Sequence, residues 1–138
     1  MEETKEYLDI LNELGNSTGK TCLKSVAHKK GLFHATVHIW FYTKTGKVLF
    51  QKRGKNKETF PNYWDVSVAG HVMAGESILN AALREVTEEI GLTIKASQLQ
   101  KMDIRKSINI HPNGIEDCEF QNVFLCKLDV TLHKLTKQ

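Results

Sequence analysis

Three glutamates near the middle of the chain are the residues whose type and spacing most directly suggest chemistry. Glu88 and Glu89 follow Glu85 by three and four positions, so an α-helix would place all three carboxylates on one face. Like charges at this spacing repel each other, and carboxylates near the C-terminal end of a helix oppose its dipole. A divalent cation would relieve both costs, and ligands that are all oxygen suit Mg²⁺ or Mn²⁺. The alternative is a solvated acidic helix face, which the charges alone predict equally well.

The residues around these glutamates predict the helix that would position them. Gly75 precedes the helical pattern, and Glu76 is expected in the first turn, where the helix dipole favours a negative charge. Gly91 is placed to end the helix. Apolar side chains recur on a neighbouring arc and are expected to face a hydrophobic core: Leu79, Ala82, Leu83, Val86 and Ile90.

The whole segment resembles the signature of the Nudix hydrolases. Gly70 is followed after five residues by Glu76, and the segment ends in Arg84-Glu85-Val86-Thr87-Glu88-Glu89-Ile90-Gly91-Leu92. The resemblance implies an α+β protein with the Nudix fold, a mixed β-sheet between helices. It also implies hydrolysis of a diphosphate (pyrophosphate) bond in a nucleoside diphosphate-type or related small molecule, with Mg²⁺ or Mn²⁺ as cofactor.

The same resemblance implies roles for individual residues. Arg84 would orient Glu85, and Glu76 would support Arg84 and the loop before the helix. The general base would be Glu85, or a carboxylate from the loop around Glu116, Asp117 and Glu119. Four groups would hold the metal: the carboxylates of Glu85, Glu88 and Glu89, and the carbonyl oxygen of Gly70.

A basic loop precedes this segment. Arg53 and Lys57 lie in a run of positive charges, and both are expected to bind the distal phosphate of the substrate. Arginine offers a planar fork to phosphate oxygens and lysine a point charge. For either residue, a solvated loop is an equally good interpretation.

From about His28 to Phe124 the chain also resembles the isopentenyl-diphosphate isomerases. The resemblance is carried by a histidine followed by a Leu-x-His motif, by Gly70-His71, and by an acidic pair after Gly114-Ile115. In the isomerases, three histidines and two carboxylates hold a metal, and such a set suits Mn²⁺, Zn²⁺ or another transition ion. The resemblance implies a possible second metal site at the corresponding positions here: His28, His34, His71, Asp117 and Glu119.

Two departures from the isomerases favour hydrolysis. Isomerisation of an allylic double bond requires an acid and a base, and Ala69 stands where the isomerases carry a cysteine. The glutamate-rich half of the Nudix signature, which the isomerases relax, is intact. We therefore expect a Nudix hydrolase, and we keep two alternatives: isomerase-like activity, and a catalytically silent Nudix module that binds a ligand.

Composition indicates one ordinary domain. The 138 residues suffice for a single core, and we expect one Nudix domain over 1–138, with an N-terminal strand and turn region at 1–32 and a core at 33–132. The net charge of +3 indicates neither a nucleic-acid polymer nor a membrane as partner. The N-terminus lacks a signal-peptide pattern, and three cysteines without a CxxC pair suggest reduced thiols in a cytoplasmic protein.

Alternation of apolar and polar residues predicts the strands that would carry these side chains. Gly15-x-x-x-Gly19-Lys20-Thr21 is one residue short of a phosphate-binding P-loop and predicts a hairpin turn instead. The segment Ser25–Lys30 predicts a brief helix or turn. A hairpin is expected from His34–Thr43, a turn at Thr45-Gly46, and Val48–Arg53. The other expected strands are Tyr7–Leu11, Val66–Val72, one within Ser97–Ile110 and one within Cys118–Leu132.

The C-terminal end departs from the Nudix pattern. Nudix domains normally continue into a further strand and a C-terminal helix, which this sequence is expected to lack. An uncovered edge strand invites pairing, so a homodimer is the hypothesis for its assembly.

Overall fold

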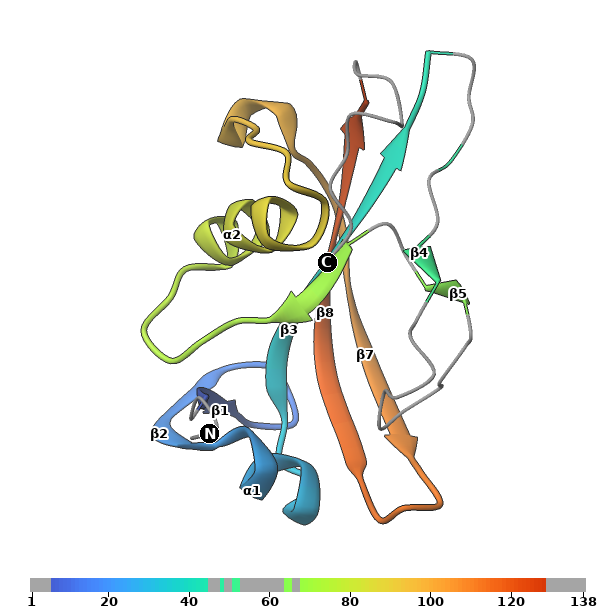
Figure 1. The fold of residues 1–138 in the computed structure, drawn as a ribbon. Helices are drawn as coiled ribbons and strands as arrows, with labels where there is room; N and C mark the ends of the chain where they lie inside the picture. Colours follow the sequence, from blue (N-terminus) through green and yellow to red (C-terminus); the bar gives the residue numbers. More distant parts are fainter. Residues whose placement is uncertain (1–5, 45–47, 49–50, 53–63, 66–67, 129–138) are drawn as a thin grey trace, which may run out of the picture.

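The computed structural model describes residues 6–44, 48, 51–52, 64–65 and 68–128 (Figure 1). This part of the chain forms two α-helices and eight strands. In order, they are β1 (Tyr7–Leu11), β2 (Ser17–Leu23), α1 (Lys24–Lys30), β3 (His34–Tyr42), β4 (Gln51–Lys52), β5 (Trp64–Asp65), β6 (Val68–His71), α2 (Ile78–Ile90), a 3₁₀ turn (Ala96–Gln98), β7 (Gln100–Ile110) and β8 (Glu116–Lys127).

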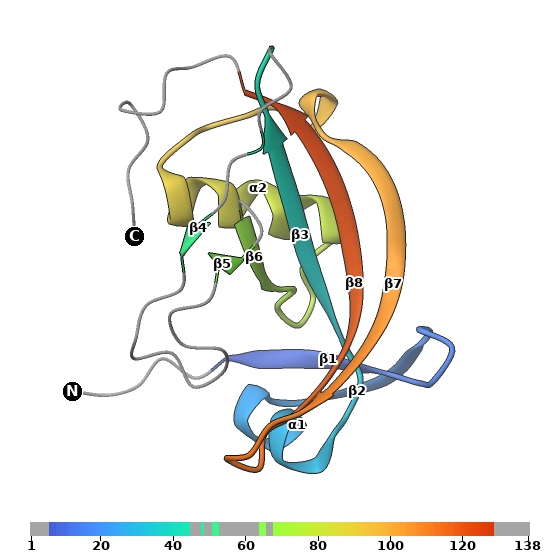
Figure 2. The same cartoon turned by 90° about the vertical axis from the view of Figure 1, so that its right-hand side faces the viewer.

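The central element is a four-stranded mixed sheet in the order β6-β3-β8-β7. β3 runs parallel to β8, and the pairs β3–β6 and β7–β8 are antiparallel. Helix α2 lies against one face of this sheet, and α1 with the β1–β2 hairpin lies at one end (Figures 1 and 2). The predicted α+β class with a mixed sheet is confirmed. The expected lack of a further strand and a C-terminal helix is a prediction about the end of the chain, and residues 129–138 lie outside the described residues.

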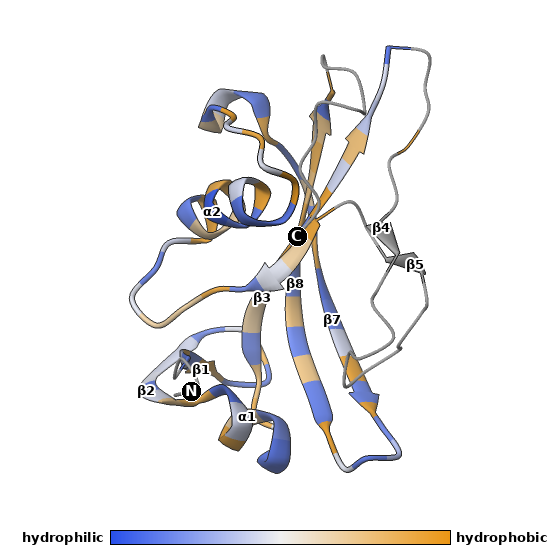
Figure 3. Cartoon of the chain, in the orientation of Figure 1, coloured by the Kyte–Doolittle hydropathy of each residue, from blue (hydrophilic) through white to orange (hydrophobic). Residues whose placement is uncertain are grey.

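The main hydrophobic core forms between α2 and the sheet. Val37, Ile39 and Phe41 alternate along β3 and are fully buried, and they pack with Ala82 and Val86 of α2. Figure 3 shows the corresponding alternation of apolar and polar residues along the central strands. Because the core lies under α2, the polar side of this helix can carry its carboxylates at the edge of the sheet.

Helix α2 confirms the predicted end but begins later than expected. Gly91 adopts a left-handed conformation with φ 68°, and it closes the helix. The Ser77 hydroxyl accepts a hydrogen bond from the Asn80 amide and caps the start. Glu76 therefore precedes the cap, and its expected place in the first turn was wrong.

The buried side of α2 is also shifted. Leu79 is 39% exposed, and Leu83 is only partly buried, whereas Ala81 is buried and Ile78 packs against the core. The sheet meets the side of the arc that carries Ile78 and Ala81, so including Leu79 among the core residues was wrong. Ala82, Val86 and Ile90 are buried as predicted.

The N-terminal region confirms a hairpin rather than a P-loop. β1 and β2 pair antiparallel around a turn at Gly15, which has φ 86° and donates a hydrogen bond to the Asn12 carbonyl. The turn is shorter than predicted, since β2 already includes Gly19. The predicted brief helix is α1, which packs Ala27 against Leu8 in a second small core.

The predicted hairpin of His34–Thr43 with Val48–Arg53 is seen only at its start among the described residues. Val48 forms an isolated bridge with Tyr42, but Gln51–Lys52 pairs with Trp64–Asp65 instead of continuing the hairpin with β3. The predicted turn at Thr45-Gly46 lies outside the described residues. Among the described residues, no helix is long and apolar enough to cross a membrane.

Candidate functional site

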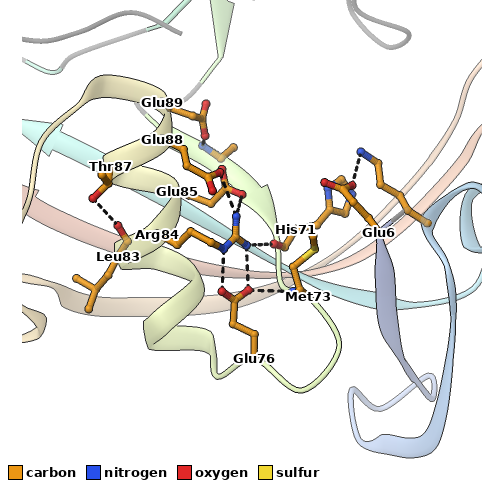
Figure 4. Close-up of polar contacts among 12 residues, drawn as sticks. Glu6, His71, Met73, Glu76, Leu83, Arg84, Glu85, Thr87, Glu88 and Glu89 are labelled. Atoms are coloured by element: carbon orange, nitrogen blue, oxygen red, sulfur yellow. Dashed lines mark hydrogen bonds and ion pairs between the residues drawn. The ribbon is translucent and has the colours of Figure 1, made fainter. Parts of the chain in front are cut away.

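Arg84 is the centre of a hydrogen-bond network on α2 (Figure 4). Its Nε and Nη2 donate to the two carboxylate oxygens of Glu76, at 2.8 and 2.9 Å. Its Nη1 donates to Glu85 at 2.8 Å and to Glu88 at 3.2 Å. Its Nη2 also donates to the backbone oxygen of His71, at 3.0 Å. The guanidinium thus connects the loop before α2, the end of β6 and two carboxylates of the helix.

These contacts shift the pKa values of both Arg84 and Glu76. Hydrogen bonds from Arg84 hold the pKa of the Glu76 carboxyl below its ordinary value. The hydrogen bond to Glu76 in turn raises the pKa of Arg84 above its ordinary range. Both groups are therefore charged near neutral pH. Glu76 also accepts a hydrogen bond of 3.0 Å from the Met73 amide, so it ties the loop to the arginine.

Glu85 lies against Gly70 of β6. A Cβ atom at position 70 would overlap the Glu85 carboxylate, so only glycine leaves room for this carboxylate at the sheet. Burial raises the pKa of Glu85, and the neighbouring Glu88 raises it further, while Arg84 opposes both effects. Glu89 accepts a hydrogen bond of 3.2 Å from the Ala69 amide. Glu85 and Glu89 thus bring two carboxylates of α2 to neighbouring residues of β6.

This donor set fits a hard divalent cation. The three carboxylates lie on one side of α2, beside the Gly70 backbone, and all candidate donors are oxygens. The raised pKa of Glu85 means that its anionic form is destabilised in the metal-free protein, and a cation would remove this cost. The residues expected as ligands are therefore brought together here, and their role as ligands stays a prediction.

A second group of candidate ligands lies on the opposite face of the sheet, at His71, the residue that follows Gly70 in β6. Its ligand atoms all lie within 4.8 Å of one another, and they come from α1, β3, β6 and β8: His28, His34, His71 and Asp117. We call this group the histidine cluster. The rings of His34 and His71 stack with centroids 5.1 Å apart, and those of His28 and His34 are 5.4 Å apart. Three imidazoles and a carboxylate suit a transition ion.

The protonation of the histidine cluster favours metal binding. Burial lowers the pKa of His71 to about 3 and also lowers the pKa of His34, so both rings are neutral near neutral pH. His34 Nδ1 lies 3.1 Å from the Leu32 carbonyl, which can only accept, so Nδ1 carries the proton and Nε2 offers a lone pair. His71 Nε2 is buried and has no hydrogen-bond partner among the described residues. These features fit a bound metal ion.

Glu119, expected as a fifth ligand, makes other contacts. Its carboxylate accepts hydrogen bonds from Gln121 at 3.1 Å and from Thr36 at 3.4 Å, and it lies 3.8 Å from His38 Nε2. Burial raises the pKa of Glu119, but hydrogen bonding with His38 and Gln121 outweighs it and holds this pKa below its ordinary value. The compact cluster of four ligands does not include Glu119.

Sequence reasoning missed two of these contacts. His38 follows His34 by four positions in β3, so strand alternation would have placed both on one face, and the pairing of β3 with β8 brings Glu119 to this face. The hydrogen bond from Arg84 to the His71 backbone oxygen has no signal in the sequence, because it depends on how α2 packs on β6. The expected phosphate-binding residues Arg53 and Lys57 lie outside the described residues.

Comparison with known proteins identifies the family. A NUDIX domain model matches residues 32–136. An uncharacterised Nudix hydrolase of Listeria monocytogenes is 38% identical over 130 residues, which cover 94% of this chain and 74% of the relative. The isopentenyl-diphosphate Delta-isomerase of an Escherichia coli strain is 33% identical, over 88% of this chain and 66% of that protein. Among solved structures, DR0079 of Deinococcus radiodurans has a TM-score of 0.69 and 25% identity, over 96% of this chain and 76% of that one.

The chain belongs to the Nudix hydrolase family. Members of this family hydrolyse acid anhydrides in phosphorus-containing small molecules and generally use divalent metals. Similarity to both hydrolases and isomerases agrees with the dual resemblance seen in the sequence.

Proposed function

We propose that this protein is a metal-dependent hydrolase of a small-molecule diphosphate, with Glu85, Glu88 and Glu89 as its metal ligands. The observation that carries the proposal is the Arg84 network, which fixes Glu85 at the position that Gly70 leaves open. A solvated acidic face would not need a partly buried carboxylate whose pKa is raised. The Gly70 carbonyl is the proposed fourth ligand.

Each residue of the site has a distinct proposed task. Bound Mg²⁺ or Mn²⁺ would supply charge neutralisation for the diphosphate oxygens as the P–O bond breaks. Arg84 holds Glu85 and Glu88 in place through Nη1. Glu76 holds Arg84 through two hydrogen bonds and thereby fixes the loop that connects β6 to α2. Arg53 and Lys57 are proposed to bind the distal phosphate.

The general base is Glu85 or a carboxylate from the group Glu116, Asp117 and Glu119, which the start of β8 carries and not a loop as expected. Glu85 lies on the face of the sheet that is covered by α2, next to Gly70. Glu119 contacts Thr36 and Gln121 and lies on the opposite face, since alternate residues of a strand point to opposite sides. A Glu119→Gln variant that keeps most of its turnover would exclude Glu119 as the base and favour Glu85. A Glu119→Gln variant as impaired as Glu85→Gln would assign a catalytic part to Glu119.

The isomerase-like alternative has one structural observation in its favour, the histidine cluster. The relative named as an isomerase supports it as well. Ala69 counts against it, because a methyl group cannot transfer a proton at the position of the isomerase cysteine. Incubation of isopentenyl diphosphate in D₂O separates the two functions. Deuterium in the isoprenoid product, seen by NMR, would favour the isomerase, and its absence together with diphosphate cleavage would favour the hydrolase.

The hydrolase is tested by phosphate release, coupled to a phosphatase, across four substrate classes. These classes are nucleoside triphosphates, dinucleoside polyphosphates, nucleotide sugars and prenyl diphosphates. The assay is run with Mg²⁺, with Mn²⁺ and with a chelator, for the wild type, for Glu85→Gln and for Glu13→Gln. Glu13 is an exposed glutamate away from α2 and serves as the matched control. We expect metal-dependent turnover that Glu85→Gln abolishes and Glu13→Gln preserves. A protein that binds the metal but turns over no substrate would support a silent binding module.

A further inference from the structure

His71 belongs to both candidate metal sites. Its imidazole is one of the four ligands of the histidine cluster. Its backbone oxygen accepts the hydrogen bond from Arg84 Nη2, and Arg84 in turn holds Glu85 and Glu88 (Figure 4). One residue at the end of β6 therefore joins the imidazole ligands to the carboxylates of α2.

The guanidinium of Arg84 has no spare donor. Arginine has five N–H groups in a rigid planar fork. Nε and one N–H of Nη2 reach Glu76, the two N–H groups of Nη1 reach Glu85 and Glu88, and the last reaches the His71 backbone oxygen. Because all five are engaged, a shift of the His71 carbonyl either breaks one hydrogen bond or turns the fork that aligns Glu85.

The side chain of His71 is the part that a cluster ion would constrain. Its Nε2 atom is buried and makes no hydrogen bond to any described residue, so no such hydrogen bond holds this nitrogen in place. The rings of His28 and His34 lie 5.4 and 5.1 Å from the His71 ring and come from α1 and β3. An ion held by these rings would fix the His71 ring relative to the sheet, and with it the end of β6.

We propose that a transition ion in the histidine cluster and Mg²⁺ at the α2 carboxylates bind cooperatively, with His71 as the positioning residue that couples them through Arg84. The inference rests on the proposed function, since it requires a cation at the carboxylates. Both ions favour the same placement of the His71 backbone oxygen, one through the imidazole and the other through Arg84 and Glu85. Coupling of this kind is reciprocal, so each ion raises the affinity for the other by the same factor.

The test uses the full chain, stripped of metal, with Co²⁺ as the probe. Visible absorption of imidazole-ligated Co²⁺ reports the cluster, and titrations are made with and without saturating Mg²⁺. We expect saturating Mg²⁺ to tighten Co²⁺ binding by at least about five-fold. Calorimetry should show that loaded Co²⁺ tightens Mg²⁺ binding by the same factor.

Three variants separate the coupling from a general effect on folding. His28→Gln removes a cluster ligand that comes from α1 and not from α2 or β6, so Mg²⁺ should still bind but should lose its response to Co²⁺. His38→Gln is the matched control, because it replaces a β3 histidine outside the cluster and should keep the coupling. Arg84→Lys keeps the charge but cannot reach the His71 oxygen and two carboxylates together, so the coupling should fall below about two-fold.

The outcomes distinguish this inference from the hydrolase itself. Binding of both ions with independent affinities, or unchanged coupling in Arg84→Lys, would overturn the coupling and leave the hydrolase intact. Failure of Co²⁺ to bind the cluster would overturn the coupling as well. Failure of Mg²⁺ to bind in the wild type and in His28→Gln would overturn both proposals.

Discussion

Gly70→Ala is predicted to damage catalysis while leaving the fold in place. The added Cβ would overlap the Glu85 carboxylate, whereas ordinary contact begins at 3.4 Å. Gly70 lies in β6 without a positive φ, so alanine fits the backbone there. The obstacle is the end of a flexible side chain, so the carboxylate rather than the strand should give way.

The size of the effect follows from the displacement. The Glu85 carboxylate must retreat by about 1 Å, and a misplacement of this size can cost about 100-fold in rate. We therefore expect kcat to fall about 100-fold with the best substrate found in the phosphate-release assay. The melting temperature should stay within a few degrees of the wild type. An alanine that fits the backbone of a strand changes the free energy of unfolding by roughly 1 kcal/mol or less.

A double-mutant cycle with Glu85→Gln shows whether the loss acts through Glu85. If it does, Gly70→Ala should lower kcat almost no further in the Glu85→Gln background, since Glu85→Gln has already removed the function of this carboxylate. A kcat of Gly70→Ala close to the wild-type value would refute the placement of Glu85 against Gly70. Full additivity of the two losses would refute the mechanism by displacement.

Two further predictions concern stability and assembly. Glu76→Gln should lower the free energy of unfolding at pH 7 by about 1–2 kcal/mol, through loss of charge-assisted hydrogen bonds to Arg84. Because the folded pKa of Glu76 is lowered, its contribution is full above the ordinary value of 4.5 and is lost as the pH falls through the folded pKa, so urea titrations should show the two proteins converging in acid. β7 is the edge of the described sheet, and Ile104 and Ile108 are 50% and 57% exposed on it, so sedimentation at high concentration should show a homodimer. Ile108→Lys should shift it to monomer, whereas Leu14→Lys, at an 82% exposed position elsewhere, should not; a wild-type monomer at high concentration would count against this interface.

Local patterns predicted the elements that depend on nearby residues. The existence of α2, its end at Gly91 and its buried Ala82, Val86 and Ile90 follow from helical spacing. The alternation in β3 follows from the same kind of rule for strands. The start of α2 could not be placed from Glu76 because the Ser77 cap decides it.

Contacts between distant segments could not be predicted in the same way. β3 and β8 pair in parallel with His34 opposite Glu119, and no short turn joins these strands to set their register, because they are far apart in the sequence. The pairing of Gln51–Lys52 with Trp64–Asp65, in place of continued pairing with β3, could not be predicted for the same reason. The histidine cluster was expected from resemblance, but only the fold separates Asp117, whose oxygen joins the rings, from Glu119, which Thr36 and Gln121 hold.

Hydrolysis in water enriched in ¹⁸O tests the central claim most directly. With Mg²⁺ and a substrate from the active class, mass spectrometry should find one ¹⁸O atom in a phosphate-containing product, because water attacks phosphorus. Removal of the metal by a chelator, or Glu85→Gln, should abolish the labelled product. Turnover that persists at the same rate with chelator and in Glu85→Gln would contradict the proposed site.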